Sequence, residues 1–524
     1  MEYIAGSDRQ QTHFLPPTVE DYVGLDNPVR FLDAFVEKLD LRRMGFGFPK
    51  QDAQGRGRPG YHPGELLKLY LYGYVNQIRA SRRLEAECHR NLEVIWLLRQ
   101  LKPDFKTIAD FRKDNAKAFK EVVRQFTQLC RQLDLFGGQL LAIDGTKIKA
   151  SNAPDRNWSQ SKLDKQMAKI DERLEEYLQA LDGADAQIQA GVSSVNAQEL
   201  KAKIARLEEH KVEIKQRLSQ LAQSGQTQHS ATDPDSRSLK SKQGHVVGYN
   251  VQGSVDAKHH LLVTTEATTA IADQGQLAAV AQAAKAELQI QRADIVADGG
   301  YFKSEDIKAC QEMGMEPHLP SVNNSPSQRA GLYGKNDFRY DAGHNLYHCP
   351  AGATLRYRRQ TQDKGRTLFN YDNPAACRVC PVKAHCTSAK YRTISRWEHE
   401  ACLDRMYAAV AAHPEKLAQR KVLIEHPWGT LKYILPGGFI VRGLTRVGAE
   451  LSLAHFAYNL KRALAVVGLE KLLQALKGFN PGGKSGSTLL FSLLLRLAAL
   501  IGRLGTVPWR YRPRSRGYCH SASG

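Results

Sequence analysis

Apolar residues at helical spacing dominate the first quarter of the chain. Residues 28–41 and 63–77 carry apolar side chains three or four positions apart, and a serine that suits a helix N-cap opens residues 81–90. A Gly/Arg/Pro-rich stretch, 54–60, interrupts the pattern. The sequence therefore predicts an N-terminal helical domain over residues 1–136.

The pattern changes to that of β-strands after residue 138. The run QLLAIDGTKIKA places Asp144 after apolar residues and before Gly145, which predicts a buried strand that enters a turn. Residues 244–268 contain two β-rich runs, and 274–288 have helical spacing. The run DIVAD is a further short apolar strand that ends at Asp298. This order predicts an α/β fold with a mixed sheet.

Two heptad stretches separate the first predicted strand from the next. The apolar residues with 4-3 spacing are Leu163, Met167, Ile170, Leu174, Tyr177 and Leu181, then Leu200, Ile204, Leu207, Ile214, Leu218 and Leu221. They predict an antiparallel coiled-coil hairpin over 160–224, inserted into the globular domain. The hairpin either packs only on itself or mediates dimerisation or DNA contact, and the sequence does not choose.

The chain becomes helical again from Arg420, with a long amphipathic stretch after Phe439. We expect a catalytic domain over 137–470 and a basic tail over 471–524. The best apolar run, 489–501, is shorter than the ~20 residues that a membrane span needs. With no signal peptide visible at the N-terminus, the expected location is the cytoplasm.

Charge narrows the choice of partners. The 524 residues carry 74 Lys and Arg against 54 Asp and Glu, a net charge of +20. Nine Lys or Arg and no acid follow residue 470, so 20 − 9 leaves +11 for the rest. A polyanion is expected, either nucleic acid or a membrane surface, although a basic enzyme without such a partner stays an alternative. In the helical domain, Arg79, Arg82 and Arg83 could belong to a helix-turn-helix-like DNA reader or be solvated charges.

Three acids stand out as candidate chemistry. Asp144 and Asp298 each follow an apolar strand and precede glycine, and Glu425 lies in LIEHPWGTLK, where Pro427 suggests the start of a helix. A lone Asp after a strand is usually a turn or cap residue. Two such elements and a Glu would suit phosphodiester cleavage by two Mg²⁺ ions about 4 Å apart, which carboxylates bind well. Without metal, three clustered acids should raise at least one pKa.

Four of the nine cysteines cluster in a turn-rich region, 311–400. Cys349, Cys377, Cys380 and Cys386 form C-x27-C-x2-C-x5-C. The CxxC half suits a structural Zn²⁺, but the first half lacks a second CxxC, so reduced free thiols and an iron–sulfur cluster remain alternatives. Spare ligands are available in His344, His348 and His385.

The segments IDGTKIKASNA, YNVQGSVD, VADGGY, IEHPWGTLK and FIVRGLTRVGAELSLAHFAYNLKRAL, in this order, carry a family resemblance. Together with YHPGELLKLYLYGYVNQIRASRRLE and TIADFR, they resemble the DDE transposases of bacterial insertion sequences. The closest group is insertion sequence 1182, within the insertion-sequence-4-like superfamily. The resemblance covers about residues 15 to 465.

The resemblance implies a specific fold and activity. The catalytic core would be an RNase H-like mixed sheet flanked by helices, with Asp144 on the first strand, Asp298 at the end of the fourth and Glu425 on a later helix. The implied activity is DNA transposition with two Mg²⁺ ions, for which Mn²⁺ can substitute: cleavage at the transposon ends, then strand transfer into target DNA. The implied partners are double-stranded DNA and a second copy in a synaptic homodimer.

The family pattern also suggests DNA-contacting residues. It places a Tyr and an Arg before the Glu and a Lys seven residues after it. Lys432 fits the last place, whereas Ala418 and Lys421 stand at the first two and Arg420 is adjacent. The remaining candidates are Lys147 and Lys149 on one face of the first strand, Trp428 as a base-stacking or core residue, and Arg442 as a phosphate contact or helix-end partner. A catalytically silent DNA-binding protein and a Mg²⁺ nuclease without strand transfer are the alternative functions.

Overall fold

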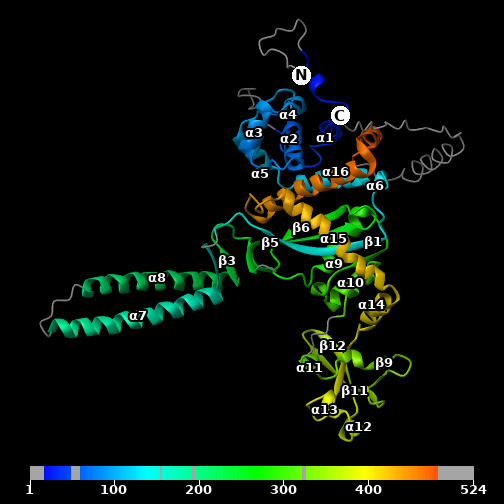
Figure 1. Ribbon diagram of the computed structural model, residues 1–524. Coiled ribbons are helices and arrows are strands. Elements are labelled where there is room, and N and C mark those ends of the chain that lie inside the picture. Colours follow the sequence, from blue (N-terminus) through cyan, green and yellow to red (C-terminus); the bar gives the residue numbers. More distant parts are fainter. Residues whose placement is uncertain are drawn as a thin grey trace, which may run out of the picture. The chain divides into compact units, whose positions relative to one another are not determined.

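The structure is a computed structural model (Figure 1). It describes residues 17–48, 60–153, 156–189, 196–225, 227–241, 244–321 and 326–481. Most of the predicted basic tail, 471–524, therefore lies outside the described residues.

Short helices make up the N-terminal part of the described chain. They are η1 (Val19–Tyr22), α1 (Val29–Glu37), α2 (Pro63–Val75), α3 (Ser81–Arg90), α4 (Leu92–Leu97), α5 (Phe105–Asp114) and α6 (Phe119–Gln132). Their starts follow local chemistry: Pro63 takes the first position of α2, and the Asp104 side chain accepts hydrogen bonds from the amides of Lys106 and Thr107 at the start of α5. Almost all of α2 is buried, so it forms the centre of this helical part.

A mixed sheet forms the centre of the fold. Its strands are β1 (Leu140–Lys149), β4 (Arg237–Ser241), β5 (Gly244–Asp256), β6 (Leu262–Thr268), β7 (Ala293–Val296) and β8 (Met315–His318). The strand order is β4-β5-β1-β7-β8, with β6 also on β5. β1 is antiparallel to β5 and parallel to β7, and β7 is parallel to β8, so the predicted mixed α/β architecture is present.

The prediction of a turn at Gly145 is wrong. β1 continues through Asp144 and Gly145 to Lys149 and pairs with β5 along this whole length. The glycine serves a different purpose, because a Cβ at Gly145 would lie 2.4 Å from Gln252 Nε2 and 2.7 Å from Asp273 Oδ1. A side chain at 145 would therefore force these buried polar groups to shift, whereas the backbone conformation does not require glycine.

Helices pack on the sheet and connect it to the N-terminal part. They are α9 (Leu277–Leu288), η3 (Gly299–Tyr301), α10 (Ser304–Glu312), α14 (Ala401–Ala412), α15 (Pro414–Ile434) and α16 (Leu444–Lys477). α15 packs on β1 and β5, while α16 packs on β6 and on α2 and α6 (Figure 1). Phe456 of α16 contacts the rings of Phe35 and Phe126. The predicted amphipathic stretch is thus a helix whose middle is buried on all sides, because the sheet and the N-terminal helices both cover it.

Two long helices stand between β1 and β5 in the sequence, together with the short strands β2 (Asn157–Ser159) and β3 (Gln228–Ser230). α7 (Gln160–Gln189) and α8 (Asn196–Ser224) pack together through Leu163, Ile170, Ile214 and Leu221. Lys211, which breaks the heptad pattern, forms an ion pair with Asp171 at 2.5 Å. This ion pair between α8 and α7 explains why a lysine is tolerated at a heptad position.

The cysteine region forms a second sheet with its own core, not the irregular turns that the sequence suggests. The strands β9 (Arg339–Asp341), β10 (Leu346–His348), β11 (Thr354–Asp363), β12 (Arg366–Asp372) and β13 (Thr393–Trp397) pair antiparallel in the order β13-β12-β11-β10-β9. The accompanying helices are α11 (Pro326–Arg329), η4 (Lys335–Asp337), α12 (Pro374–Arg378) and α13 (Lys383–Cys386). The core residues are Phe338, Tyr347, Leu355, Tyr371 and Ile394.

Among the described helices, none combines the length and the apolar character needed to cross a bilayer.

Candidate active site

Strand register brings Asp144 and Asp298 next to each other. In the parallel pairing of β1 with β7, Ala142 lies opposite Val296. Asp144 lies two residues further along β1, and Asp298 lies two residues after Val296, the last residue of β7, close enough for its charge to act on Asp144. The Asp298 carboxylate accepts a hydrogen bond of 2.9 Å from the Gly300 amide, which fixes the turn after β7.

The charge state of Asp144 reflects this neighbourhood. Burial is the largest influence and, together with the negative charges of Asp298 and Asp273, raises the pKa of Asp144 to about 6. A hydrogen bond from the Gly145 amide and the positive charge of Arg420 act in the opposite direction. Asp144 is therefore a carboxylate under like-charge stress, with a cation from α15 nearby.

The prediction that Pro427 starts a helix is wrong. α15 begins at Pro414 and runs through Pro427, which places Glu425 in the middle of the helix. A proline inside a helix removes one backbone hydrogen bond, so its presence suggested a terminus that tertiary packing overrides. The helix is held on the sheet by buried residues on either side of this position, including Ile424 and Trp428.

Trp428 orients α15 above the aspartates. A Cβ on Gly253 would lie 2.9 Å from the Trp428 Cη2 atom, so the indole covers Gly253, which pairs directly with Asp144. Residues three apart share a helix face, so Glu425 lies on the side of α15 that carries Trp428. Trp428 itself is buried and cannot stack on a DNA base in this conformation.

The structure brings Asp144, Asp298 and Arg420 together, but Glu425 remains exposed. Among the described residues, no group of three or more His, Cys, Asp or Glu side chains is arranged to hold a metal ion.

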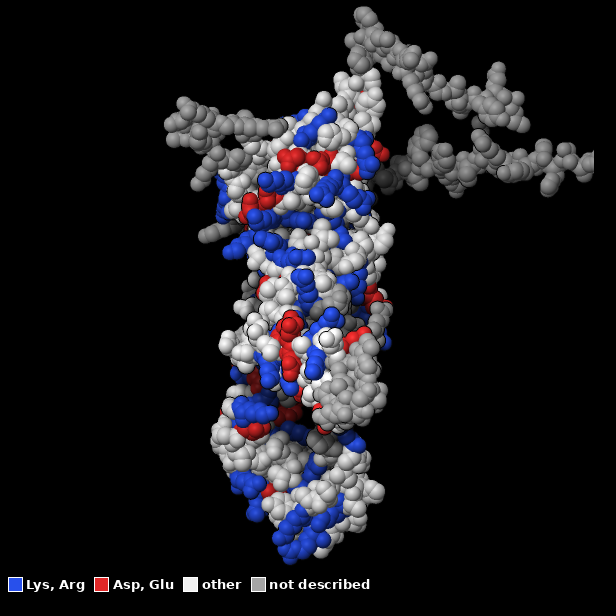
Figure 2. Space-filling model, turned by 90° about the vertical axis from the view of Figure 1, so that its left-hand side faces the viewer, with Lys and Arg blue, Asp and Glu red and all other residues white. Residues whose placement is uncertain are grey.

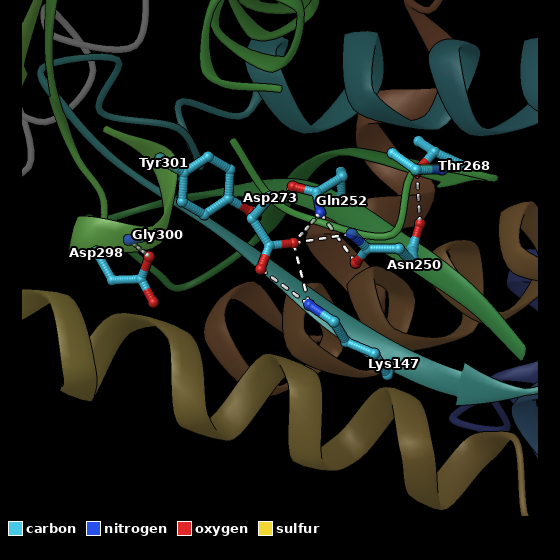
Figure 3. Close-up of polar contacts among 9 residues, drawn as sticks. Lys147, Asn250, Gln252, Thr268, Asp273, Asp298, Gly300 and Tyr301 are labelled. Atoms are coloured by element: carbon cyan, nitrogen blue, oxygen red, sulfur yellow. Dashed lines mark hydrogen bonds and ion pairs between the residues drawn. The ribbon is translucent and has the colours of Figure 1, made fainter. Parts of the chain in front are cut away.

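A polar network lies on the face of β1 and β5 that is not covered by Trp428 of α15 (Figure 3). Asp273 accepts from Lys147 at 2.9 Å, from Asn250 at 2.8 Å and from Gln252 at 2.7 Å. The Tyr301 hydroxyl donates to Gln252 Oε1. Burial by itself would raise the pKa of Asp273, but its hydrogen bonds, that from Lys147 foremost, outweigh this and hold it below its usual value.

Sequence reasoning missed Asp273 and Tyr301. Asp273 lies in the loop before α9, where no hydrophobic pattern marks it. One signal was available: Asn250 and Gln252 alternate within a strongly apolar strand, and two buried polar side chains on one face require a partner.

The basic candidates around the sheet have different surroundings. Lys147 forms an ion pair with Asp273 within the network, and its role in lining a DNA path stays a prediction. Lys149, Lys421 and Lys432 are exposed. Arg442 is also exposed, and its Nε donates to the Ser151 carbonyl oxygen at 3.0 Å.

The arginines of the N-terminal part divide in the same way. Arg82 and Arg83 are exposed on α3, and the Arg82 guanidinium lies 4.9 Å from the centre of the Phe105 ring. Arg79 is only 7% exposed and contacts Glu450 and two backbone carbonyls, so in this structure its guanidinium is neither solvated nor accessible to DNA. Figure 2 shows basic side chains spread over one face of the molecule, with acidic ones among them.

The four clustered cysteines line one cavity of about 30 Å³. None forms a disulfide, and burial and the other three thiols raise the pKa of Cys386 despite the charge of Arg392. Two of the spare histidines are instead directed at Asp341: His344 at 2.9 Å and His348 at 3.7 Å. The predicted thiol cluster therefore exists, while those histidines are engaged elsewhere.

Comparisons with known proteins give the family. A family described as a transposase domain (DUF772) matches residues 17–114, and one described as a transposase DDE domain matches residues 348–464. A search of curated proteins gave no significant match. The cryo-EM structure of a piggyBac transposase synaptic complex with hairpin DNA is similar over 92% of this chain and 83% of that chain, at 9% identity and a TM-score of 0.27, which is too low to support an argument. The first family covers α1 to α5 and the second contains Glu425 and most of α16, and together they indicate that the chain is a DDE transposase of the insertion-sequence type.

Proposed function

We propose that this transposase binds the ends of its insertion sequence, cleaves them and transfers the freed strand to target DNA, using Asp144, Asp298 and Glu425. The observation that carries the proposal is the neighbouring placement of Asp144, on β1, and Asp298, just after β7, with Arg420 near Asp144. The strand arrangement supports an RNase H-like core: apart from β4 at the edge, Asp144 lies on the first strand and Asp298 follows the fourth.

We expect the two aspartates and Glu425 to hold a pair of divalent cations only after Glu425 moves, because these side chains as placed form no metal site. A carboxylate whose pKa is raised by burial and a like charge is one that a cation would stabilise, and hard oxygen ligands suit Mg²⁺ or Mn²⁺. Asp144 and Asp298 would be shared ligands, and Glu425 would complete the set if its side chain turns from solvent towards β1. The ions would supply an activated water and charge stabilisation at the phosphate.

The chain's own groups would position the DNA. Arg420 faces the aspartates, and the exposed Lys421 and Lys432 lie on the same helix as Glu425. Lys149 and Arg442 lie near one end of β1, and Arg82 and Arg83 on α3 offer a further contact with phosphates. A synaptic homodimer on double-stranded DNA is part of the proposal.

A supercoiled plasmid with the cognate inverted repeats tests the activity. Wild type with Mg²⁺ should release ends and join them to a target, and Glu425→Gln should abolish both while end binding persists. Glu415→Gln, an exposed carboxylate near the start of the same helix, is the matched control and should retain activity. Binding without cleavage by wild type would favour the silent DNA-binding protein, and cleavage without joining would favour the nuclease.

Zinc at the cysteine cavity is a separate proposal: four thiols line one small space, and they would have to move closer together to coordinate an ion. Metal analysis of purified protein should find about one zinc per chain. Cys380→Ser should lose it, whereas Cys130→Ser, a buried cysteine on α6, should not. If purified wild type contains no zinc and shows a cooperative unfolding transition, the four cysteines are reduced thiols without a metal.

A further inference from the structure

We propose that Tyr301, Gln252 and Asp273 act as positioning residues that hold the Asp298 turn against β1, so that Asp144 and Asp298 keep the spacing a divalent cation requires. The inference rests on the proposed function. It concerns residues behind the site, on the face of β1 opposite α15, which would not themselves touch metal or DNA.

The network starts in the turn that carries Asp298. The Tyr301 amide donates to the Asp298 carbonyl oxygen at 3.2 Å, and the Asp298 carboxylate binds the Gly300 amide in the same turn. Tyr301 is completely buried, and its hydroxyl reaches Gln252 on β5. The ring therefore ties the turn after β7 to a strand two positions away in the sheet.

Gln252 passes the connection on to β1. Its side-chain amide donates to Asp273, and Asp273 in turn binds Lys147, three residues after Asp144. Gln252 also donates to Asn250 at 3.0 Å, so its amide is fixed in one orientation. The chain of contacts thus runs from the turn of Asp298 to the strand of Asp144.

Gly145 shows how tightly the network presses on β1. A Cβ at this position would approach Gln252 Nε2 at 2.4 Å, Asp273 Oδ1 at 2.7 Å and the Tyr301 hydroxyl at 3.1 Å. Three members of the network therefore converge behind the residue that follows Asp144. Figure 3 shows the side chains of Asn250, Gln252 and Lys147 directed towards Asp273, with Tyr301 between this group and Asp298.

This geometry predicts a specific defect in cation binding. Residues that orient the ligands of a metal commonly change metal affinity by 10- to 100-fold when they are removed. Tyr301→Phe deletes only the hydroxyl that binds Gln252 and leaves the ring in the core. The turn of Asp298 would then lose its connection to β5 while the fold is kept.

The test is a titration of the full-length, metal-free protein with Mn²⁺, followed by electron paramagnetic resonance without DNA. Tyr301→Phe should raise the Mn²⁺ dissociation constant about tenfold. Tyr249→Phe is the matched control, because it too removes one buried hydroxyl. Tyr249 lies on β5, on the face away from Gln252, and its hydroxyl donates to Asp233 at 2.8 Å. The control should lose comparable thermal stability but keep wild-type Mn²⁺ affinity.

A second variant tests whether Gln252 links Tyr301 to β1. Gln252→Leu should weaken Mn²⁺ binding as well, and the double variant with Tyr301→Phe should be no weaker than the poorer single variant, because both break the same connection. Additive effects, unchanged affinity in Tyr301→Phe, or equal effects in the Tyr249→Phe control would overturn the network. Absence of Mn²⁺ binding and DNA cleavage in wild type would instead remove the proposed function.

Discussion

Trp428 on α15 lies directly over Gly253 on β5, the residue paired with Asp144. A Cβ at Gly253 would come within 2.9 Å of the indole and 2.6 Å of the Thr264 carbonyl oxygen. Contacts this short do not occur without displacement, so the helix with Glu425 can approach β1 only because residue 253 has no side chain.

Gly253→Ala should therefore damage both packing and cleavage. We expect a loss of about 1–3 kcal/mol in the free energy of unfolding, typical of overpacking, and a larger loss of end cleavage as α15 moves outward. Gly429→Ala on the same helix is the control, because a Cβ there meets no atom within 4 Å. The control should be stabilised by roughly 0.5–1 kcal/mol and remain active. Full activity of Gly253→Ala would show that the approach of α15 is unimportant.

Asp144→Asn should make the metal-free protein more stable at pH 7.5. The folded-state pKa of about 6 lies above the unfolded value, so ionisation of Asp144 costs stability as the pH rises from about 4 to 6, and the whole cost is present above pH 6. The amide removes that cost, which we expect to be about 1–3 kcal/mol. Chemical denaturation in EDTA at pH 4 and 7.5 measures it. A variant less stable than wild type at pH 7.5 would contradict the cost assigned to burial and like charge at Asp144. Mn²⁺ should stabilise wild type but not the variant.

The sequence predicted which strands and helix carry the site residues, but not where β1 and α15 begin and end. Apolar runs identified the strands of Asp144 and Asp298, and the family resemblance assigned Glu425. Gly145 and Pro427 were read through local rules as a turn and a helix start, whereas β1 and α15 run straight through them. Pairing with β5 and packing on the sheet supply more free energy than these local preferences, and a single sequence does not reveal such partners.

The sequence also did not show which distant residues pair with one another in the folded protein. Lys147 and Arg79 looked like free cations because their partners, Asp273 and Glu450, lie 126 and 371 residues further along the chain. The same distance hid the Tyr301–Gln252–Asp273 network.

Arg420→Gln should shift the acid limb of the cleavage pH profile to higher pH. The Arg420 charge lowers the pKa of Asp144, so its loss lets burial and Asp298 raise that pKa further. Protonated Asp144 cannot serve as a ligand, and more alkaline conditions are then needed for half-maximal rate. Lys416→Gln is the control on α15, since Lys416 pairs with Asp294 at 2.9 Å. The rate of end cleavage between pH 5 and 8, at one fixed Mg²⁺ concentration below saturation, measures the shift, and identical midpoints for wild type and Arg420→Gln would rule it out.

Arg79 and Arg83 should separate stability from DNA binding, although they are four residues apart. Arg79 forms a buried ion pair with Glu450 at 2.9 Å, and Glu450 also accepts from the amides of Ile440 and Val441. Arg79→Ala removes the only cation within ion-pair distance of that buried carboxylate among the described residues and leaves it the charge of Arg112, so the free energy of unfolding should fall by about 3 kcal/mol. Arg83 is exposed on α3, and Arg83→Ala should leave stability within about 0.5 kcal/mol of wild type.

The salt dependence of DNA binding should change in Arg83→Ala and stay the same in Arg79→Ala. Each lost phosphate contact reduces the slope of log affinity against log salt by about one, so Arg83→Ala should lower the slope, provided it contacts the backbone as proposed. Arg79→Ala, measured below its unfolding temperature, should keep the wild-type slope because a buried guanidinium releases no counterion from DNA. A reduced slope for Arg79→Ala with unchanged stability would return Arg79 to the DNA-binding surface and show that its pairing with Glu450 opens when DNA binds.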